Sequence, residues 1–111
     1  MCIRDRFSTE EKLSSVTDSV VTNLSTGDLY SASKGNGAFK NSKQISVHNE
    51  KPLYKIVGIN SSGSSPELMN RLAPIFEKHH HIRHMGANAL EMAMLADGLI
   101  DIFIDLSLIH I

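Results

Sequence analysis

Residues 83–105 read RHMGANALEMAMLADGLIDIFID, and this stretch decides the fold. Its apolar residues recur at helical spacing from Ala89 to Ala96, and Gly98 stands where a left-handed residue commonly ends a helix. From Ile100 to Asp105 apolar residues then alternate, which is typical of a strand. The strand is predicted to place two sets of side chains on opposite faces: Ile100, Ile102 and Ile104 on one, and Asp101, Phe103 and Asp105 on the other.

Another strand and helix precede this stretch. Residues 54–59 form a short, largely apolar run suited to a strand that is buried on both faces. After a polar loop, Ser64 or Ser65 is predicted to cap a helix, because apolar residues follow at helical spacing. Pro74 should kink this helix, since proline removes one backbone hydrogen bond. Residues 80–85 are short and end before a glycine, so we interpret them as a further strand.

The first half of the chain carries the signals of β-hairpins. Two β-prone runs, 20–24 and 29–32, flank a short turn that contains Gly27. A second turn follows at Asn36-Gly37, where the sequence supplies the positive φ that tight turns need. The short strands expected after it are 38–39 and 44–47.

The order of these elements predicts the fold class. A β-hairpin region followed by β-α-β-α-β indicates an α/β protein with an open sheet. The first and last six residues resemble translated sequencing-adapter ends, so we interpret both as non-native; a natural start and a natural terminal strand are the alternative. The predicted division is a non-native terminus at 1–6, the hairpin part of an N-terminal domain at 7–50 with a polar linker at 48–52, an incomplete α/β C-terminal domain at 51–105, and a second non-native terminus at 106–111.

Composition and charge argue against several classes of function. The 111 residues include 11 Lys and Arg and 12 Asp and Glu without long runs, so there is no electrostatic case for binding nucleic acid. No apolar run approaches the roughly 20 residues of a membrane-spanning helix, and the start lacks the apolar segment of a secretory signal. The single cysteine, Cys2, cannot form an internal disulfide. We therefore expect a cytoplasmic protein that binds neither nucleic acid nor membrane.

Three stretches together resemble the inositol monophosphatase family. Residues 27–39, GDLYSASKGNGAF, match the family's hairpin pattern G-[DE]-x-Y-x-A-x-K-G-x-G-A-F. Residues 59–67, INSSGSSPE, are similar to its loop after a strand of the C-terminal domain. Residues 83–105 are similar to its R-x-x-G-[ST]-A-A-L-[DE]-x-x-x-x-A-x-G-x-[LA]-D-[AG]-[YF] helix and strand. The resemblance covers roughly residues 19–105 and implies a piece of the family's αβαβα sugar-phosphatase fold.

The resemblance also implies the chemistry of the intact protein. We expect a Mg²⁺-dependent phosphoric monoester hydrolase that uses metal-activated water and forms a homodimer. Its substrate would be inositol monophosphate or a related sugar phosphate, and the ending IDIFID is similar to the archaeal-type branch that also acts on fructose 1,6-bisphosphate. The family binds its metals through an upstream Glu, an upstream Asp-Pro-[IL]-Asp-Gly-Thr motif and a downstream Trp-Asp pair, and none of these occurs in this sequence. We therefore predict no catalytic or metal-binding residue in this chain, and no phosphatase activity for the chain alone.

The same resemblance implies five substrate-binding residues: Ser62, Gly86, Ala87, Asn88 and Asp105. Gly86 begins the place where the backbone of the family's Gly-[ST]-Ala contacts the substrate, although Asn88 replaces the usual alanine. A strand that ends in glycine and opens a helix presents free N–H groups and the positive end of the helix dipole. Asp105 corresponds to an acidic residue that accepts hydrogen bonds from substrate hydroxyls. Ser62 corresponds to a serine of the substrate loop, and Ser61 is an equal candidate.

Alternatives are kept for several features. Gly86 could instead allow close packing of a helix against the sheet, and the glycines at 35–37 belong to a hairpin turn rather than to a phosphate cradle. Four histidines could suggest a metal site, but neighbours on a helix do not face each other, and a helix C-terminus favours positive charge: they are His79, His80, His81 and His84. Nucleotide 3′-phosphates and histidinol phosphate are alternative substrates. A different class of function is a non-catalytic module that binds a small ligand or dimerises.

Overall fold

The computed structural model describes residues 2–47 and 55–107, with side chains from Phe7 onward, and contains two sheets within them. The antiparallel sheet has the strand order β1-β2-β3-β4-β5, and its members are β1 (Cys2–Ser8), β2 (Val16–Asn23), β3 (Leu29–Ser33), β4 (Gly37–Lys40) and β5 (Lys43–Ile45), with the 3₁₀ turn η1 (Leu13–Ser15) between the first two. The parallel sheet has the order β7-β6-β8, with β6 (Ile56–Asn60), β7 (His81–Arg83) and β8 (Ile102–Asp105). The helices are α1 (Pro66–Arg71), α2 (Ala73–Lys78) and α3 (Asn88–Ala96).

Tight turns set the register of the antiparallel sheet. Both predicted hairpins are present, and Gly27 and Gly35 adopt φ of 78° and 81° in their turns, a conformation that glycine adopts without strain. A third turn joins β4 to β5 through Asn41 and Ser42, whose φ values of 49° and 68° are unusual outside glycine. The Asn41 side chain stabilises this turn, because its Oδ1 accepts the N–H of Leu29 at 2.9 Å. No glycine marks this turn in the sequence, and it was not predicted.

Local signals also fix the ends of the helices. The Ser65 hydroxyl accepts the N–H of Leu68 at 3.2 Å and caps α1, so of the two predicted caps Ser65 is the one used. The kink expected at Pro74 is confirmed as a break at Leu72 that separates α1 from α2. At the end of α3, the N–H groups of Gly98 and Leu99 bond back to the carbonyls of Leu95 and Met94 at 3.1 and 2.9 Å. With φ of 74° at Gly98, these bonds form the left-handed cap that the sequence predicts.

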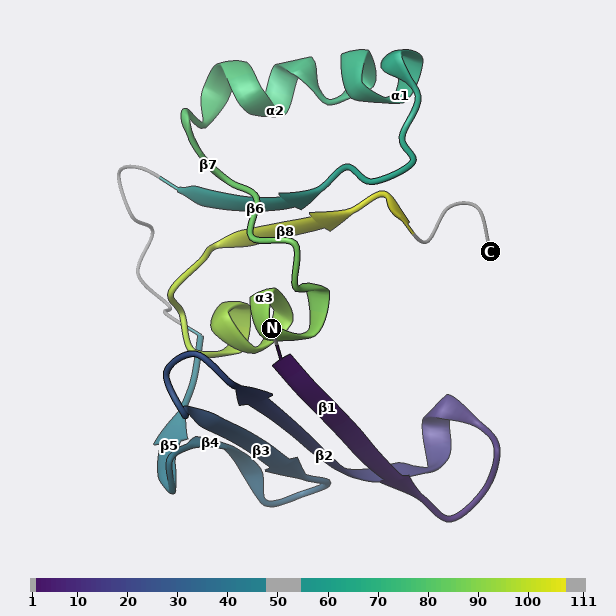
Figure 1. The fold of residues 1–111 in the computed structure, drawn as a ribbon, viewed down its shortest axis with the longest axis vertical. Coiled ribbons are helices and arrows are strands. Elements are labelled where there is room, and N and C mark those ends of the chain that lie inside the picture. Colours follow the sequence, from purple (N-terminus) through teal and green to yellow (C-terminus); the bar gives the residue numbers. More distant parts are fainter. Residues whose placement is uncertain (1, 48–54, 108–111) are drawn as a thin grey trace.

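The elements form four layers (Figure 1). Helices α1 and α2 cover one face of the parallel sheet and α3 covers the other, while the antiparallel sheet lies on the far side of α3. Helix α3 is therefore held between the two sheets, in contact with β8 on one side and with β1 and β2 on the other. The predicted α/β class and the β-α-β-α-β order of the second half are confirmed. Within the described residues no helix is long and apolar enough to cross a bilayer.

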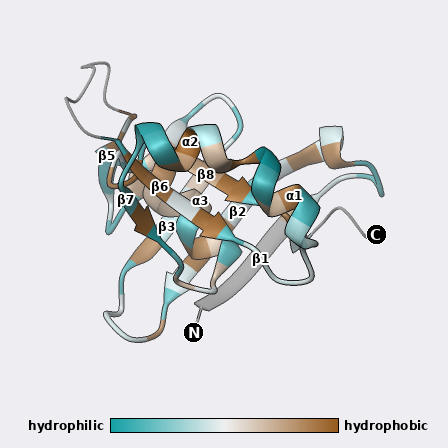
Figure 2. Cartoon of the chain, turned by 90° about the horizontal axis from the view of Figure 1, so that it is seen from above, coloured by the Kyte–Doolittle hydropathy of each residue, from teal (hydrophilic) through white to brown (hydrophobic). Residues whose placement is uncertain are grey.

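The core lies mainly in the α/β half, which comprises residues 55–107. Figure 2 shows hydrophobic residues on β6 and β8. A Cβ added at Gly58 would lie 3.1 Å from Ile100 Cδ1 and 3.2 Å from Phe103 Cδ2, so glycine is needed there for close packing. The buried apolar residues among those described are Tyr30, Val57, Ile59, Leu90, Ile100 and Leu106.

Several predicted boundaries differ from the structure because strand pairing sets them. Strand β2 begins at Val16 rather than at residue 20, since β1 pairs along it as far as Ser8. Strand β7 covers only 81–83 of the predicted 80–85, because only these residues pair with β6. Strand β5 is 43–45 rather than 44–47. The alternation predicted for residues 100–105 is wrong at Ile100, which shares the side of Phe103 because it precedes β8.

The predicted termini and linker stand as follows. Residues 2–6 belong to β1, and Leu106 is buried and donates its N–H to the carbonyl of Asn60 at 2.8 Å. The interpretation of 1–6 and 106–111 as non-native, and the division into domains, stay predictions. The linker 48–52 lies outside the described residues.

Candidate functional site

The candidate site lies where β6 and β8 end. These strands run parallel, and their pairing sets Asn60 opposite Asp105 at the final register position of both. Because the carboxyl ends of parallel strands meet at one edge of a sheet, polar residues placed there commonly form the ligand site of an α/β protein. Asn60 is only 7% exposed, although it is polar, so its side chain needs partners within the protein.

A chain of hydrogen bonds joins this edge of the sheet to the start of α3. Asn60 Nδ2 donates to Asn88 Oδ1 at 2.5 Å, and Asn88 Nδ2 donates to Asp105 Oδ2 at 2.5 Å. Ser107 completes the network, because both its N–H and its hydroxyl donate to Asp105 Oδ1, at 2.9 and 2.6 Å. At the other end, the N–H of Ser62 donates to Asn60 Oδ1 at 3.1 Å. We call these five residues the edge network.

The turn into α3 lies beside the edge network. Gly86 has φ of 72°, and nothing lies within 4 Å of a Cβ added there, so its backbone conformation rather than close packing calls for glycine. The alternative that Gly86 permits close helix packing is therefore wrong, whereas close packing does require glycine at Gly58, against Ile100 and Phe103. Ala87 is the N-cap of α3, and no side chain caps this helix end.

A buried glutamate stabilises the turn into α3 by hydrogen bonds. Glu91 is fully buried, and its Oε1 accepts the N–H of Met85 at 3.3 Å while its own N–H donates to the carbonyl of Ala87 at 2.9 Å. Its Oε2 has no hydrogen-bond partner among the described residues. Nothing in the sequence marks Glu91 as buried, because a glutamate in the first turn of a helix usually faces solvent.

The edge network opens onto a cavity of about 710 Å³ between α3 and the antiparallel sheet. Asn88 and Asp105 line one part of it, and Tyr30 and Phe39 line the sheet side. Met92, in the middle of α3, also lines it and is 60% exposed. The cavity is therefore mainly apolar, with an amide and a carboxylate among its few polar groups.

The structure brings together most of the residues that the resemblance implied. Asn88 and Asp105 are in direct contact, and Ser62 joins them through Asn60, whereas Ser61 contributes its backbone carbonyl as an acceptor for the Ser64 hydroxyl. The preceding residues Gly86 and Ala87 form the turn into α3. What each residue does to a substrate stays a prediction.

Asn60 and Ser107 were missed by the sequence analysis. The available signal for Asn60 was that it directly follows the expected strand 54–59, at a strand end where polar residues gather in parallel sheets. Ser107 was excluded because it falls in the stretch interpreted as non-native.

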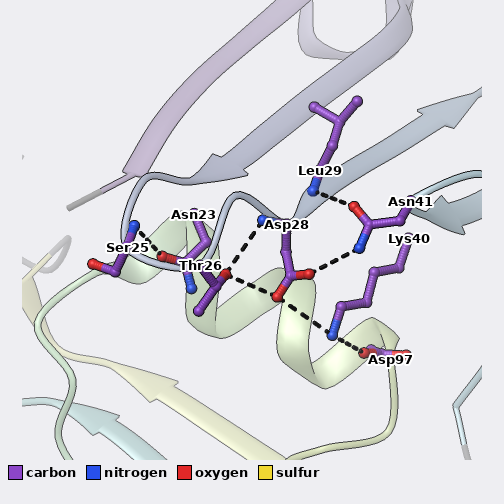
Figure 3. A network of polar contacts seen from close by, with 8 residues as sticks. All are labelled: Asn23, Ser25, Thr26, Asp28, Leu29, Lys40, Asn41 and Asp97. Atoms are coloured by element: carbon purple, nitrogen blue, oxygen red, sulfur yellow. Dashed lines mark hydrogen bonds and ion pairs between the residues drawn. The ribbon is translucent and has the colours of Figure 1, made fainter.

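A second polar cluster lies at the opposite end of α3 (Figure 3). Lys40 Nζ lies 3.7 Å from Asp28 Oδ2 and 3.5 Å from Asp97 Oδ2, so one lysine joins the antiparallel sheet to the C-cap of α3. Asp28 accepts two further hydrogen bonds: Asn41 Nδ2 donates to Asp28 Oδ1 at 2.8 Å, and the Thr26 hydroxyl donates to Asp28 Oδ2 at 2.8 Å. The hydrogen bonds from Asn41 and Thr26, with the charge of Lys40, lower the pKa of Asp28 below its usual 3.8. We call these residues the Lys40 cluster and regard it as structural.

The described residues do not fit a metal site. Nowhere in 7–47 and 55–107 do three His, Cys, Asp or Glu side chains lie close enough to hold one ion, and this includes the histidines at 79–84. The edge network supplies only one carboxylate, whereas Mg²⁺ in proteins is usually bound by carboxylates together with substrate phosphate. We therefore assign no metal-dependent step to these residues.

The chain is similar in sequence to proteins of one known family. A family model described as the inositol monophosphatase family matches residues 13–111. A curated protein from Methanothermobacter thermautotrophicus, named fructose-1,6-bisphosphatase/inositol-1-monophosphatase, is 36% identical over 95 residues, which are 85% of this chain and 33% of that protein. A bifunctional NADP phosphatase/NAD kinase from Methanocaldococcus jannaschii is 37% identical over 93 residues, which are 79% of this chain and 16% of that protein.

A solved structure shows the same fold. Inositol monophosphatase II from Staphylococcus aureus superposes with a TM-score of 0.70 at 27% identity, covering 79% of this chain and 35% of that one. The chain thus spans about a third or less of the length of these similar proteins.

Proposed function

The chain belongs to the inositol monophosphatase family, and from this premise we propose that it is the substrate-hydroxyl-binding part of a Mg²⁺-dependent phosphatase. The proposed substrate is inositol monophosphate or a related sugar phosphate, with fructose 1,6-bisphosphate as a candidate because the Methanothermobacter relative carries both names. The reaction is hydrolysis of a phosphate monoester by metal-activated water. Since the chain spans about a third of that relative, the metal ligands are proposed to lie in parts of the protein beyond it.

The edge network is the observation that carries this proposal. It joins Asn88 and Asp105 by a hydrogen bond at the edge of a cavity large enough for a sugar phosphate. A carboxylate accepts hydrogen bonds and repels anions, so Asp105 suits the hydroxyl end of such a substrate and not its phosphate. The uncapped N-terminus of α3, preceded by Gly86, offers N–H groups to the remainder of the substrate.

The first test separates binding from catalysis. The purified 111-residue chain should release no phosphate from inositol 1-phosphate in the presence of Mg²⁺, because the described residues hold no metal-binding group. The complete protein that carries this segment should release it, and EDTA should abolish the activity. Sustained, EDTA-sensitive release by the chain alone would contradict the assignment of catalysis to other segments. A non-catalytic ligand-binding or dimerisation module would give no release from the complete protein either.

The second test concerns Asp105 in that complete protein. Asp105→Asn keeps the shape but removes the charge, so kcat/KM should fall about tenfold or more, as expected for the loss of charge-assisted hydrogen bonds. The Mg²⁺ dependence should be nearly unchanged. Asp97→Asn is the matched control, because the same change at the other end of α3 affects only the Lys40 cluster. A strong rise in the Mg²⁺ requirement with unchanged KM would show that Asp105 serves the metal instead.

A nucleotide phosphate is the second candidate substrate. The similarity to the Methanocaldococcus protein named as an NADP phosphatase favours it. Parallel assays with inositol 1-phosphate, fructose 1,6-bisphosphate and NADP would rank the three. A cytoplasmic location, expected from the composition, and a homodimer, expected from the family resemblance, are also part of the proposal, and light scattering of the complete protein would test the dimer.

A further inference from the structure

The side chain of Asn88 stands where the family pattern has alanine, and it contacts Asp105 directly. We infer that Asn88 is a specificity-determining residue, whose Oδ1 and the Oδ2 of Asp105 together accept hydrogen bonds from two hydroxyl groups of one ligand. The inference rests on the proposed function, because it assigns a new role within the same substrate site. The resemblance itself implied only a backbone contact at this position.

The orientation of the Asn88 amide follows from its neighbours. The N–H of Ser62 can only donate, so the oxygen of the Asn60 amide faces it and the Asn60 NH₂ faces Asn88. The oxygen of Asn88 must then face Asn60, and its NH₂ must face the carboxylate of Asp105. A backbone donor at one end and a carboxylate at the other thus fix both amides in one arrangement.

The free hydrogen-bonding capacity of the network can then be counted. A carboxylate has about four lone-pair positions. Asp105 Oδ1 already accepts two donors from Ser107, and Oδ2 accepts one from Asn88, so one position stays free on Oδ2. One of the two donors is the backbone N–H at position 107, which any residue except proline would supply. Asp105 can therefore accept one ligand hydroxyl rather than two.

Asn88 supplies the second acceptor. Its Oδ1 accepts one bond, from Asn60, and has a second lone pair without a partner among the described residues. Asn88 and Asp105 are both half-buried and both line the cavity, so a ligand in the cavity can reach them. Because the two free positions are both acceptors and one belongs to an anion, they fit two neighbouring hydroxyls of a polyol and disfavour a phosphate or carboxylate.

The experiment compares ligands that lack single hydroxyl groups. In the complete protein, kcat/KM would be measured for inositol 1-phosphate and its singly deoxygenated analogues. Two analogues should be poorer substrates. For the analogue that lacks the hydroxyl bound to Asp105, kcat/KM should fall about tenfold or more; for the one that lacks the hydroxyl bound to Asn88, it should fall about three- to tenfold. In Asn88→Ala the second loss should disappear and the first should persist. Asn88→Ser, whose shorter side chain cannot bridge Asn60 to Asp105, should behave likewise and serves if the alanine variant does not fold.

A second measurement does not depend on turnover. The side-chain NH₂ signals of Asn88 in the nuclear magnetic resonance spectrum should shift when unphosphorylated myo-inositol is added. If the wild type is active but both variants keep the full pattern of losses, the role of Asn88 is overturned and the proposed function stands. If the wild type hydrolyses none of the phosphates, the proposed function fails. In that case the Asn88 signal decides: a shift with myo-inositol supports the inference, and no shift overturns it.

Discussion

The antiparallel sheet and the α/β half of this chain are held together in different ways. The α/β half packs helices on both faces of its sheet, and five of the six buried apolar residues in the described part of the chain belong to it. The antiparallel sheet has α3 over part of one face, and Tyr30 is its one buried apolar residue among those described. Several of its other apolar side chains are exposed, among them Phe7 at 64% and Leu29 at 43%.

This difference shows what each half needs. Short hairpins with tight turns define the antiparallel sheet locally, so its strands pair in a definite register without a large core. The α/β half depends on long-range packing of β6 between two layers. Because the sheet is defined locally and not by a core, part of its apolar face is left uncovered, and this part lines the cavity beside α3.

The largest expected effect concerns the whole chain. We predict that the isolated 111 residues fold only marginally, because exposed strand edges and an open apolar face reduce the burial that opposes chain entropy. Circular dichroism during heating should show a broad or low-temperature transition, and exchange of amide hydrogens should be faster in β3 and β4 than in β6. A cooperative transition of the monomer above about 60 °C, in the upper mesophile range, would contradict this view.

The next effect tests the core of the α/β half. Leu90→Ala should lower the free energy of unfolding by about 2–5 kcal/mol, because Leu90 is only 8% exposed and its removal leaves a cavity. A loss of that size would unfold most molecules of a marginally stable chain, and urea titrations would measure it. Leu99→Ala makes the same chemical change at a residue that is 45% exposed and should cost under about 0.5 kcal/mol. Equal losses at the two sites would mean that α3 does not pack as described.

Two glycines distinguish packing from backbone conformation. Gly58→Val should cost about 1–3 kcal/mol by overpacking against Ile100 and Phe103. Gly35→Ala meets no atom within 4 Å, but its φ of 81° should still cost about 1–2 kcal/mol. Urea unfolding of both variants would measure these costs. If Gly58→Val proved harmless, the close packing described at Gly58 would be contradicted, and if Gly35→Ala proved harmless, the cost of its positive φ would be.

A smaller effect concerns the contact between the halves. Lys40→Met should lose about 0.2–1 kcal/mol, because Lys40 bridges Asp28 and Asp97 but its side chain is partly open to solvent. Lys43→Met, at an exposed residue of β5, is the matched control and should be neutral. Raising the salt concentration should shrink the difference between the two variants. A difference that did not respond to salt would point to packing of the lysine stem instead.

The smallest effect is acid sensitivity, confined to the antiparallel sheet. The pKa of Asp28 is lowered mainly by the hydrogen bond from Asn41, and that of Asp18 mainly by the hydrogen bond from the Ser33 hydroxyl. The stability from a lowered carboxyl pKa is fully present above the usual 3.8 and is lost as pH falls through the lower folded value. Amide exchange should therefore quicken in β2 and β3 before β6 below about pH 4. Asn41→Ala should bring the pKa of Asp28 back towards its usual value, so the loss of protection near Asp28 on acidification should become smaller, and an unchanged loss would count against this cause.

Much of the fold could be predicted from the sequence because its signals are local. Gly27 and Asn36-Gly37 marked two hairpin turns, Ser65 with Pro66 marked a helix start, and Gly98 marked a helix end. Each works within a few residues through φ preferences or a single hydrogen bond, so no knowledge of the rest of the chain is needed. The turn at Asn41-Ser42 was missed because neither residue is glycine.

The candidate site was only partly predictable, because its contacts join distant parts of the chain. The bonds from Asn60 to Asn88 and from Asn88 to Asp105 span 28 and 17 residues, and a long 3.5 Å contact joins Asn60 to Ser107 across 47. The sequence by itself determined the turns, the helix ends, the α/β order and which family the motifs resemble. Only the tertiary structure decided that Asn60 and Ser107 complete the edge network, that Gly58 is needed for packing, and that Glu91 is buried. These depend on the register of β6 with β8 and on the position of α3, which are set by the packing of whole layers and not by the preferences of neighbouring residues.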